Sequence, residues 1–209
     1  MATKKDYDTS VFINCPFDSQ YKTILDAITF AVHDSGYLAR SALEEVNTAS
    51  ERNGKIIKII RESKYGIHDI SRIEIDKTSK LPRLNMPYEL GLFYGAQAFG
   101  DANQKKKQIL VLDSEKFRYQ RTLSDIAGKD AAEHGNDPLL AIAAVRKFLT
   151  NKERGNLRGA TEIQRRYQAF LAELPTIAKL LVCTVAELQS FDYWNDYTFA
   201  MADWCSTHP

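Results

Sequence analysis

Residues 11–32 read VFINCPFDSQYKTILDAITFAV, and this stretch decides the fold. Its first part, residues 11–15, is a short apolar run that ends at Pro16 and reads as a buried strand. From Tyr21 to Val32 apolar residues recur at helical spacing, which predicts a helix directly after the strand. Because a parallel connection needs a crossover, usually a helix, this unit predicts a sheet of parallel strands.

The same alternation continues as far as residue 113. Apolar runs predict further strands at residues 37–42, 65–70 and 108–112, and helical spacing predicts helices at 55–61 and 87–99. Gly36 is typical of a helix end, and Pro87 is typical of a first helical turn. The pattern predicts an α/β domain whose parallel sheet is covered by helices on both faces.

The composition changes after Ser114. Strand patterns are absent there, and helical spacing predicts helices at residues 138–149, 160–174 and, more weakly, 185–190. Pro175 is expected to stop the second of these helices. We therefore expect one α/β domain, residues 1–113, with a helical extension, residues 114–209, packed on it. The aromatic-rich segment 192–204 reads as packing, and the alternative is a partner surface, because Trp and Tyr are common at interface hot spots.

Composition and charge restrict the classes of function. The 209 residues are 44% hydrophobic and 26% charged, which is the balance of an ordinary globular chain. The formal net charge is +1, so the chain has no general attraction to nucleic acid, and no direct nucleic-acid binding is expected. The one basic run, residues 105–107, reads as a solvated turn, and the alternative is a phosphate contact.

The cysteines and the apolar runs bear on cellular compartment. Cys15, Cys183 and Cys205 have no paired spacing, which indicates reduced thiols rather than a disulfide framework or a zinc site, and we expect no metal. The first ten residues lack the apolar stretch of a secretory signal, and no run approaches the roughly 20 apolar residues that span a bilayer. We expect a cytoplasmic protein without a membrane partner.

Candidate site residues follow from the predicted sheet. Ligands of open parallel sheets bind beyond the carboxyl ends of the strands. Three polar segments occupy such places in this chain: residues 14–18, residues 68–72, and the start of the helix that carries Glu89. We expect these three segments to converge in space.

Glu89 is the most informative of these residues. Its helix is otherwise apolar or small, so the carboxylate is expected in apolar surroundings near a helix N-terminus. An unpaired buried charge costs several kcal/mol, so Glu89 either has a structural partner or does chemistry. Gly91 and Gly95 each cost about 1 kcal/mol relative to Ala, and we expect them to allow close approach of the sheet or a ligand.

Residues 68–72 leave similar alternatives open. Asp69 either caps the loop that follows or accepts hydrogen bonds from a ribose or base. His68 alternates with Asp69 along the strand, so it points to the opposite face and reads as a structural histidine. Arg72 pairs with Asp69 or Glu89, contacts a phosphate, or forms a surface ion pair.

Four motifs together resemble a known family. They are VFINCPFD (11–18), SKYGIHDISR (63–72), LNMPYELGLFYGAQAF (84–99) and KKKQILVLD (105–113). In order and spacing they are similar to the nucleoside 2-deoxyribosyltransferase-like branch of the TIR-like superfamily. The resemblance implies a flavodoxin-like open parallel sheet flanked by helices, here with a C-terminal helical extension.

The resemblance also implies roles for individual residues. Glu89 in YELG resembles the catalytic glutamate of the family, and Asp69 in HDIS resembles its ligand-orienting aspartate, with a catalytic role where the base needs a proton. The loop 81–88 lacks an acidic residue that many of the transferases carry, which favours relatives that cleave NAD in bacterial antiphage defence. The implied ligand-binding residues are Asn14, Pro16, Phe17, Asp18, Ser71, Arg72, Asn85 and Tyr88.

These implications give one leading function and two alternatives. The leading one is an N-glycosidase that cleaves NAD or a related nucleotide as substrate and needs no cofactor. The family also implies a homo-oligomer or a partner protein of a defence system. The alternatives are a non-catalytic nucleotide sensor that signals through a partner or oligomer, and an interaction scaffold that uses the aromatic C-terminus.

Overall fold

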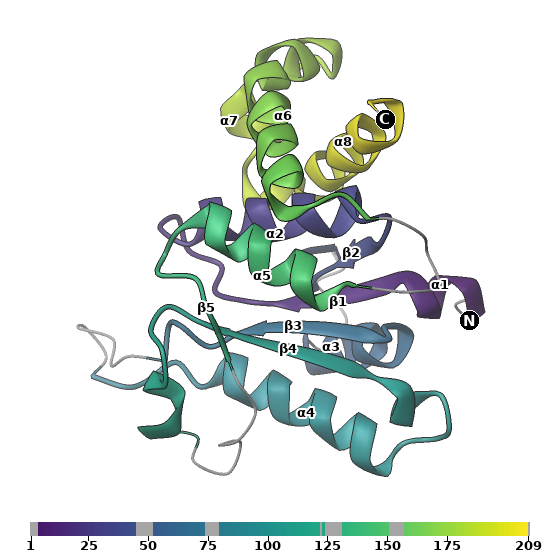
Figure 1. Cartoon of the computed structure of the whole chain (residues 1–209), viewed down its shortest axis with the longest axis vertical. Coiled ribbons are helices and arrows are strands. Elements are labelled where there is room, and N and C mark those ends of the chain that lie inside the picture. Colours follow the sequence, from purple (N-terminus) through teal and green to yellow (C-terminus); the bar gives the residue numbers. More distant parts are fainter. Residues whose placement is uncertain are drawn as a thin grey trace.

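The structure is a computed structural model that describes residues 4–44, 52–73, 80–121, 123, 131–150 and 157–208. Within those residues the chain forms one sheet of five parallel strands (Figure 1). The strands are β1 (Ser10–Asn14), β2 (Leu38–Arg40), β3 (Tyr65–Asp69), β4 (Gln108–Asp113) and β5 (Ala132–Glu133). Their order is β2-β1-β3-β4-β5, which is the flavodoxin-like order. The predicted fold class is confirmed.

Helices cover both faces of the sheet. On one face lie α2 (Lys22–Asp34) and α5 (Pro138–Phe148), and on the other lie α3 (Arg52–Glu62) and α4 (Asn85–Phe99) (Figure 1). The side chains of β1 alternate accordingly. Val11 and Ile13 belong to the core with α2 and α5, whereas Phe12 packs with Ile59 and Phe93 on the opposite side.

Three of the described strands and α-helices were missed by the sequence patterns, and one of them is α8 (Trp194–Thr207), which falls in the aromatic-rich segment. A short helix, α1 (Lys4–Thr9), precedes β1, and β5 pairs with the end of β4, so the expectation that no strand follows Ser114 is wrong. With only two residues, β5 is too short to show an alternating pattern, and its place depends on the ladder with Leu112 and Asp113. The sheet therefore continues beyond residue 113.

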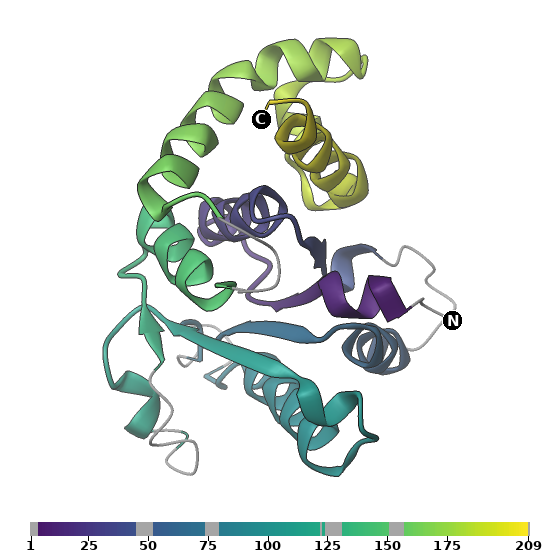
Figure 2. The same cartoon turned by 45° about the vertical axis from the view of Figure 1, so that its right-hand side comes forward.

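The C-terminal segment forms three helices that pack on the outer side of α2. They are α6 (Ala160–Leu180), α7 (Val185–Leu188) and α8 (Trp194–Thr207). Figure 2 shows α6 curving around the end of the molecule with α8 inside the curve. Trp194, Tyr197 and Trp204 are buried, which confirms the predicted packing role for these three residues, whereas Tyr193 and Phe199 are exposed.

The predicted end of α6 is wrong, because Pro175 lies inside the helix. A proline there removes one backbone hydrogen bond. The helix nevertheless continues, and its last turns pack on the core through Ile177 and the buried Ala178. Apolar burial at the end of the helix offsets the bond that Pro175 cannot make.

α2 is buried on all sides because it lies between the sheet and the C-terminal helices. Every residue from Ile24 to Asp34 is buried. At its C-terminal end Asp34 Oδ1 accepts a hydrogen bond of 2.7 Å from Arg166 Nε of α6, and both side chains are buried. The Arg166 guanidinium also lies 5.1 Å from the ring centroid of Trp204, so one arginine joins α2, α6 and α8.

One lysine of the basic run before β4 is buried, although the sequence predicts a solvated turn there. Lys105 and Lys106 are exposed, but Lys107 is only 2% exposed. Its Nζ donates hydrogen bonds to the carbonyl oxygens of Ile60, at 2.6 Å, and Ser63, and thereby caps the C-terminal end of α3. Burial lowers the pKa of Lys107 to about 7.

Cys15, Cys183 and Cys205 are free thiols. Among the described helices, none is both long and apolar enough to cross a membrane.

Candidate functional site

The candidate site lies where β1 and β3 run side by side. After β1 the chain leaves toward α2 on one face of the sheet, and after β3 it leads toward α4 on the other face (Figure 1). Such a reversal is the switch point at which open parallel sheets bind ligands beyond the carboxyl ends of their strands. The segments after Asn14 and after Asp69 both begin at this edge, as predicted.

Asp69 is the last residue of β3 and is completely buried. Its Oδ2 accepts a hydrogen bond of 2.6 Å from the Tyr21 hydroxyl, and its Oδ1 accepts one of 2.8 Å from the Ser71 backbone N–H. His134 Nε2 lies 2.9 Å from the same Oδ2. Protein groups therefore engage both oxygens of Asp69.

His134 follows β5 and was not predicted as a site residue. Its Nδ1 accepts a hydrogen bond of 3.1 Å from the Asn136 backbone N–H, so the neutral ring carries its proton on Nε2, the atom that faces Asp69. The alignment of that ring N–H is too poor for a hydrogen bond, so the contact is a close electrostatic one. No sequence pattern pointed to this residue, because the strand that positions it has two residues.

The Tyr21–Asp69–His134 cluster joins three parts of the chain: the start of α2, the end of β3 and the end of β5. Asp69 has no surface on which a ligand could rest, since it is 0% exposed. The direct ligand contact expected from the sequence is therefore not what this arrangement offers. Asp69 instead holds the edge of the sheet in position.

Glu89 lies in the second turn of α4 and is 6% exposed. Within the described part of the chain, no group donates a hydrogen bond to its carboxylate. Burial raises the pKa of Glu89 to about 7, and the positive charge of Arg52 at the start of α3 opposes this rise. Among the described residues, Glu89 therefore has the Arg52 charge nearby but no hydrogen-bond donor.

The glycines of α4 do not serve the predicted close approach. A Cβ atom at Gly91 or Gly95 would meet nothing within 4 Å, so neither residue lies against the sheet. Gly91 is exposed.

Asn14 ends β1 and is 2% exposed. Its Nδ2 donates a 2.9 Å hydrogen bond to the Met86 carbonyl oxygen and lies 3.0 Å from His68 Nδ1. Met86 is in the first turn of α4, one turn before Glu89, so Asn14 fixes the helix that carries the carboxylate. The Nδ2 atom of Asn14 is thus directed to protein groups.

His68 is a structural histidine, as predicted. It packs edge-on against the rings of Phe12 and Phe93, on the opposite face of the sheet from Asp69. Burial lowers its pKa to about 3, so the ring is neutral. Nδ1 of this neutral ring accepts a hydrogen bond from Asn14. His68 thereby helps to hold the side chain that bonds to α4.

Cys15 follows β1 directly, and the charges of both predicted carboxylates act on it. The thiol is buried, and its pKa is raised well above the usual value, first by burial and then by the charges of Asp69 and Glu89. Both carboxylates thus act on one sulfur atom at the end of β1. The raised pKa keeps Cys15 protonated and a poor nucleophile.

The turn after β1 connects the site to the C-terminal helices. Pro16 is buried, and the half-buried Phe17 contacts the ring of Phe191 at a centroid distance of 6.2 Å. Asp18 Oδ1 accepts hydrogen bonds from the backbone N–H groups of Gln20 and Tyr21, at 3.1 and 3.0 Å. This turn is therefore held from both sides.

The remaining predicted residues differ in accessibility. Ser71 is buried, and its hydroxyl has no hydrogen-bond partner within the described residues. Asn85 and Tyr88 are exposed, and the Tyr88 hydroxyl donates to Asn53 Oδ1 at 3.3 Å. Arg72 is partly exposed and lies 4.0 Å from Asp18 Oδ1, so it pairs with neither Asp69 nor Glu89.

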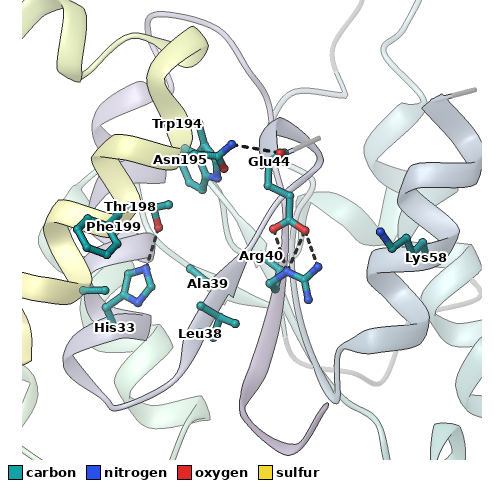
Figure 3. A pocket seen from close by; sticks show the side chains of 11 residues that line it. His33, Leu38, Ala39, Arg40, Glu44, Lys58, Trp194, Asn195, Thr198 and Phe199 are labelled. Atoms are coloured by element: carbon teal, nitrogen blue, oxygen red, sulfur yellow. Dashed lines mark hydrogen bonds and ion pairs between the residues drawn. The ribbon is translucent and has the colours of Figure 1, made fainter. Parts of the chain in front are cut away.

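Two cavities lined by described residues lie elsewhere. One, of about 400 Å³, is an open groove beside the free edge of β2, between α3 and α8 (Figure 3). Its most polar residue, Arg40, is already bound by Glu44 and Glu62. The other, of about 570 Å³, is a mostly apolar groove between α3 and α4. Neither contains Glu89 or Asp69, and among the described residues no His, Cys, Asp and Glu cluster could hold a metal ion.

No family model, no curated protein and no solved structure shows significant similarity to this chain, so the residues of the site must carry any functional argument.

Proposed function

We propose that this protein is an N-glycosidase that cleaves the bond between sugar and base in NAD or a related nucleotide. The observation that carries the proposal is the Glu89 carboxylate, which is 6% exposed, has no hydrogen-bond donor within the described residues, and lies at the edge where such sheets bind ligands. An unpaired buried carboxylate is costly, and a reaction that needs it accounts for the cost. The family resemblance supports the same reaction and would place it in antiphage defence.

The chemistry needs a negative charge beneath the sugar. In the reaction the bond from C1′ to the base nitrogen breaks, and its electron pair stays on the nitrogen. The ionised Glu89 carboxylate stabilises the positive charge that develops on the sugar, or bonds to C1′. Water then adds to C1′, one proton leaves to solvent, and the carboxylate is free again.

The surroundings of Asp69 favour one class of leaving group. A purine or pyrimidine needs a proton to leave, but Asp69 is completely buried and both its oxygens are engaged. Nicotinamide leaves a cationic glycoside as a neutral base and needs no acid. The proposal therefore favours NAD and other nicotinamide nucleotides as substrates.

The test is base release measured by chromatography. Purified protein is incubated with NAD and with a panel of nucleosides and nucleotides, and free base is quantified. The wild type is expected to release nicotinamide, and Glu89→Gln is expected to abolish release. Glu162→Gln on α6 is the matched control, because Glu162 is partly exposed and its carboxylate pairs with the exposed Arg165. Release that survives Glu89→Gln would exclude the proposed role.

A nucleotide sensor is the second candidate. The observation that favours it is the contact of Phe17, in the turn after β1, with Phe191 of the C-terminal helices. A ligand at this turn would thereby act on a second part of the molecule. A sensor is expected to show a nucleotide-dependent rise in melting temperature without base release, and the rise should persist in Glu89→Gln.

A further inference from the structure

Two arginines approach the candidate site from different loops. Arg72 follows β3, and Arg83 lies in the segment just before α4. Both point to the same carboxylate: Arg72 Nη2 lies 4.0 Å from Asp18 Oδ1, and Arg83 Nη1 lies 3.7 Å from Asp18 Oδ2. Asp18 itself follows β1. The three side chains therefore meet at the switch point of the sheet.

This group has unused donors and a surplus of positive charge. Two guanidinium groups share one carboxylate, and the distances to Asp18 are too long for strong hydrogen bonds. Among the described residues, the one acceptor bound by either arginine is Gln20 Oε1, at 3.1 Å from Arg72 Nη2. Asp18 Oδ1 is also occupied by backbone N–H groups. Within the part of the chain that the structure describes, several N–H donors of each arginine therefore have no acceptor.

The accessibility of the group fits ligand binding. Exposed fractions are 32% for Arg72, 54% for Arg83 and 27% for Asp18, so the arginines are partly covered yet reachable. The helix that begins directly after Arg83 has no side-chain cap at Leu84. Its first N–H groups add positive potential at the same place.

We propose that Arg72 and Arg83 form a phosphate clamp, ordered by Asp18, that selects nucleoside 5′-phosphates over free nucleosides. A guanidinium binds phosphate with two parallel hydrogen bonds, and two of them from separate loops would hold one phosphate from two directions. Asp18 keeps both side chains near the site before the ligand arrives. The proposal rests on the proposed function, because it assumes a sugar placed at Glu89.

The experiment compares ligands that differ only by the 5′-phosphate. Nicotinamide riboside is paired with nicotinamide mononucleotide, and adenosine with AMP, and dissociation constants are measured by calorimetry in the Glu89→Gln background to prevent turnover. The phosphorylated member of each pair is expected to bind at least about tenfold more tightly. Arg72→Gln and Arg83→Gln are each expected to reduce that ratio by about tenfold while leaving the affinity for the nucleoside unchanged.

The control is Arg165→Gln, which removes the same charge from an exposed position on α6. It should leave the ratio intact. The proposal is overturned if the two clamp variants keep the ratio of the dissociation constants, or if they weaken the binding of nucleosides and nucleotides equally. It is also overturned if the phosphorylated member of a pair does not bind more tightly, or if neither member binds.

Base release by the wild type is scored separately. Preference for phosphorylated ligands without base release would support the clamp and contradict the glycosidase. Base release by a protein that binds nucleosides and nucleotides equally well would support the glycosidase and contradict the clamp.

Discussion

At the scale of single residues, the proposed function depends on the ionisation of Glu89. Burial raises its pKa to about 7, so near neutral pH a large fraction of the carboxyl is protonated and unable to stabilise a cationic sugar. We expect the rate of base release to rise with pH through about 7 and then to level off. The measurement is kcat/KM for nicotinamide release across that range.

Arg52 provides the control for this pH dependence. Its positive charge lowers the pKa of Glu89, so Arg52→Ala is expected to move the rise in rate to higher pH without abolishing activity at alkaline pH. A rate that is independent of pH around 7 in the wild type would contradict the assignment of Glu89.

The ionisation of Glu89 is also expected to change the free energy of unfolding. The pKa of Glu89 in the folded state is about 7, above its ordinary value of 4.5, so the folded protein binds this proton more tightly than the unfolded chain. The stability associated with the neutral carboxyl is fully present below 4.5 and is lost as the pH rises through about 7. Glu89→Gln is therefore expected to be more stable than the wild type at pH 8, by on the order of 1–3 kcal/mol, and about equal at pH 4. Urea unfolding at the two pH values measures this difference, and Glu162→Gln should show no comparable change.

At the scale of elements, α4 is placed by one buried amide. The Asn14 amide donates a hydrogen bond to the Met86 carbonyl oxygen in the first turn of α4, and it faces His68 on β3. Asn14→Ala leaves these buried groups without a partner, which is expected to cost about 1–3 kcal/mol of unfolding free energy and to lower base release as Glu89 moves. Asn85→Ala is the matched control, because Asn85 is exposed at the start of the same helix. Loss of stability with unchanged kcat would show that α4 stays in place without Asn14.

The elements also show what the sequence could predict. The strands β1 and β4 were predicted because each contains a short apolar run, and β1 and β3 are buried along their whole length. The sites of Asp69 and Glu89 followed from the chain order, since both lie just where a strand ends or the next helix begins. β5 could not be predicted because its two residues carry no pattern.

The roles of the site residues were less predictable than their positions. Asp69 is bound by Tyr21, 48 residues before it, and by His134, and neither neighbour can be inferred from local spacing. Tyr21 reads in the sequence as one apolar residue of a helix, yet its hydroxyl is the donor that occupies Asp69. Lys107 likewise reads as part of a charge run, but it is buried, and its Nζ donates a hydrogen bond to a carbonyl oxygen at the C-terminal end of α3.

At the scale of the whole molecule, the C-terminal helices complete the core. α2 carries apolar and buried residues around its whole circumference, which suits a helix packed on two sides and not a surface helix. The aromatic residues of α6 and α8 supply the second side, as seen in the contacts of Phe30 with Phe170 and Trp204. The extension is therefore a structural part of the fold, whatever further role it has.

The ion pair between Asp34 and Arg166 tests this dependence, because it joins α2 to α6 across that second side. Arg166→Ala leaves Asp34, which is 7% exposed, with the longer 3.9 Å contact from Arg158 Nη1, and is expected to cost up to about 3–5 kcal/mol of unfolding free energy. In the double variant Asp34→Ala with Arg166→Ala, neither charge remains unpaired, so the total cost should be smaller than the sum of the two single costs. Urea unfolding of all four proteins gives the coupling energy. Additive costs would mean that the pair contributes nothing to the docking of α6, and that apolar packing alone holds the C-terminal helices on α2.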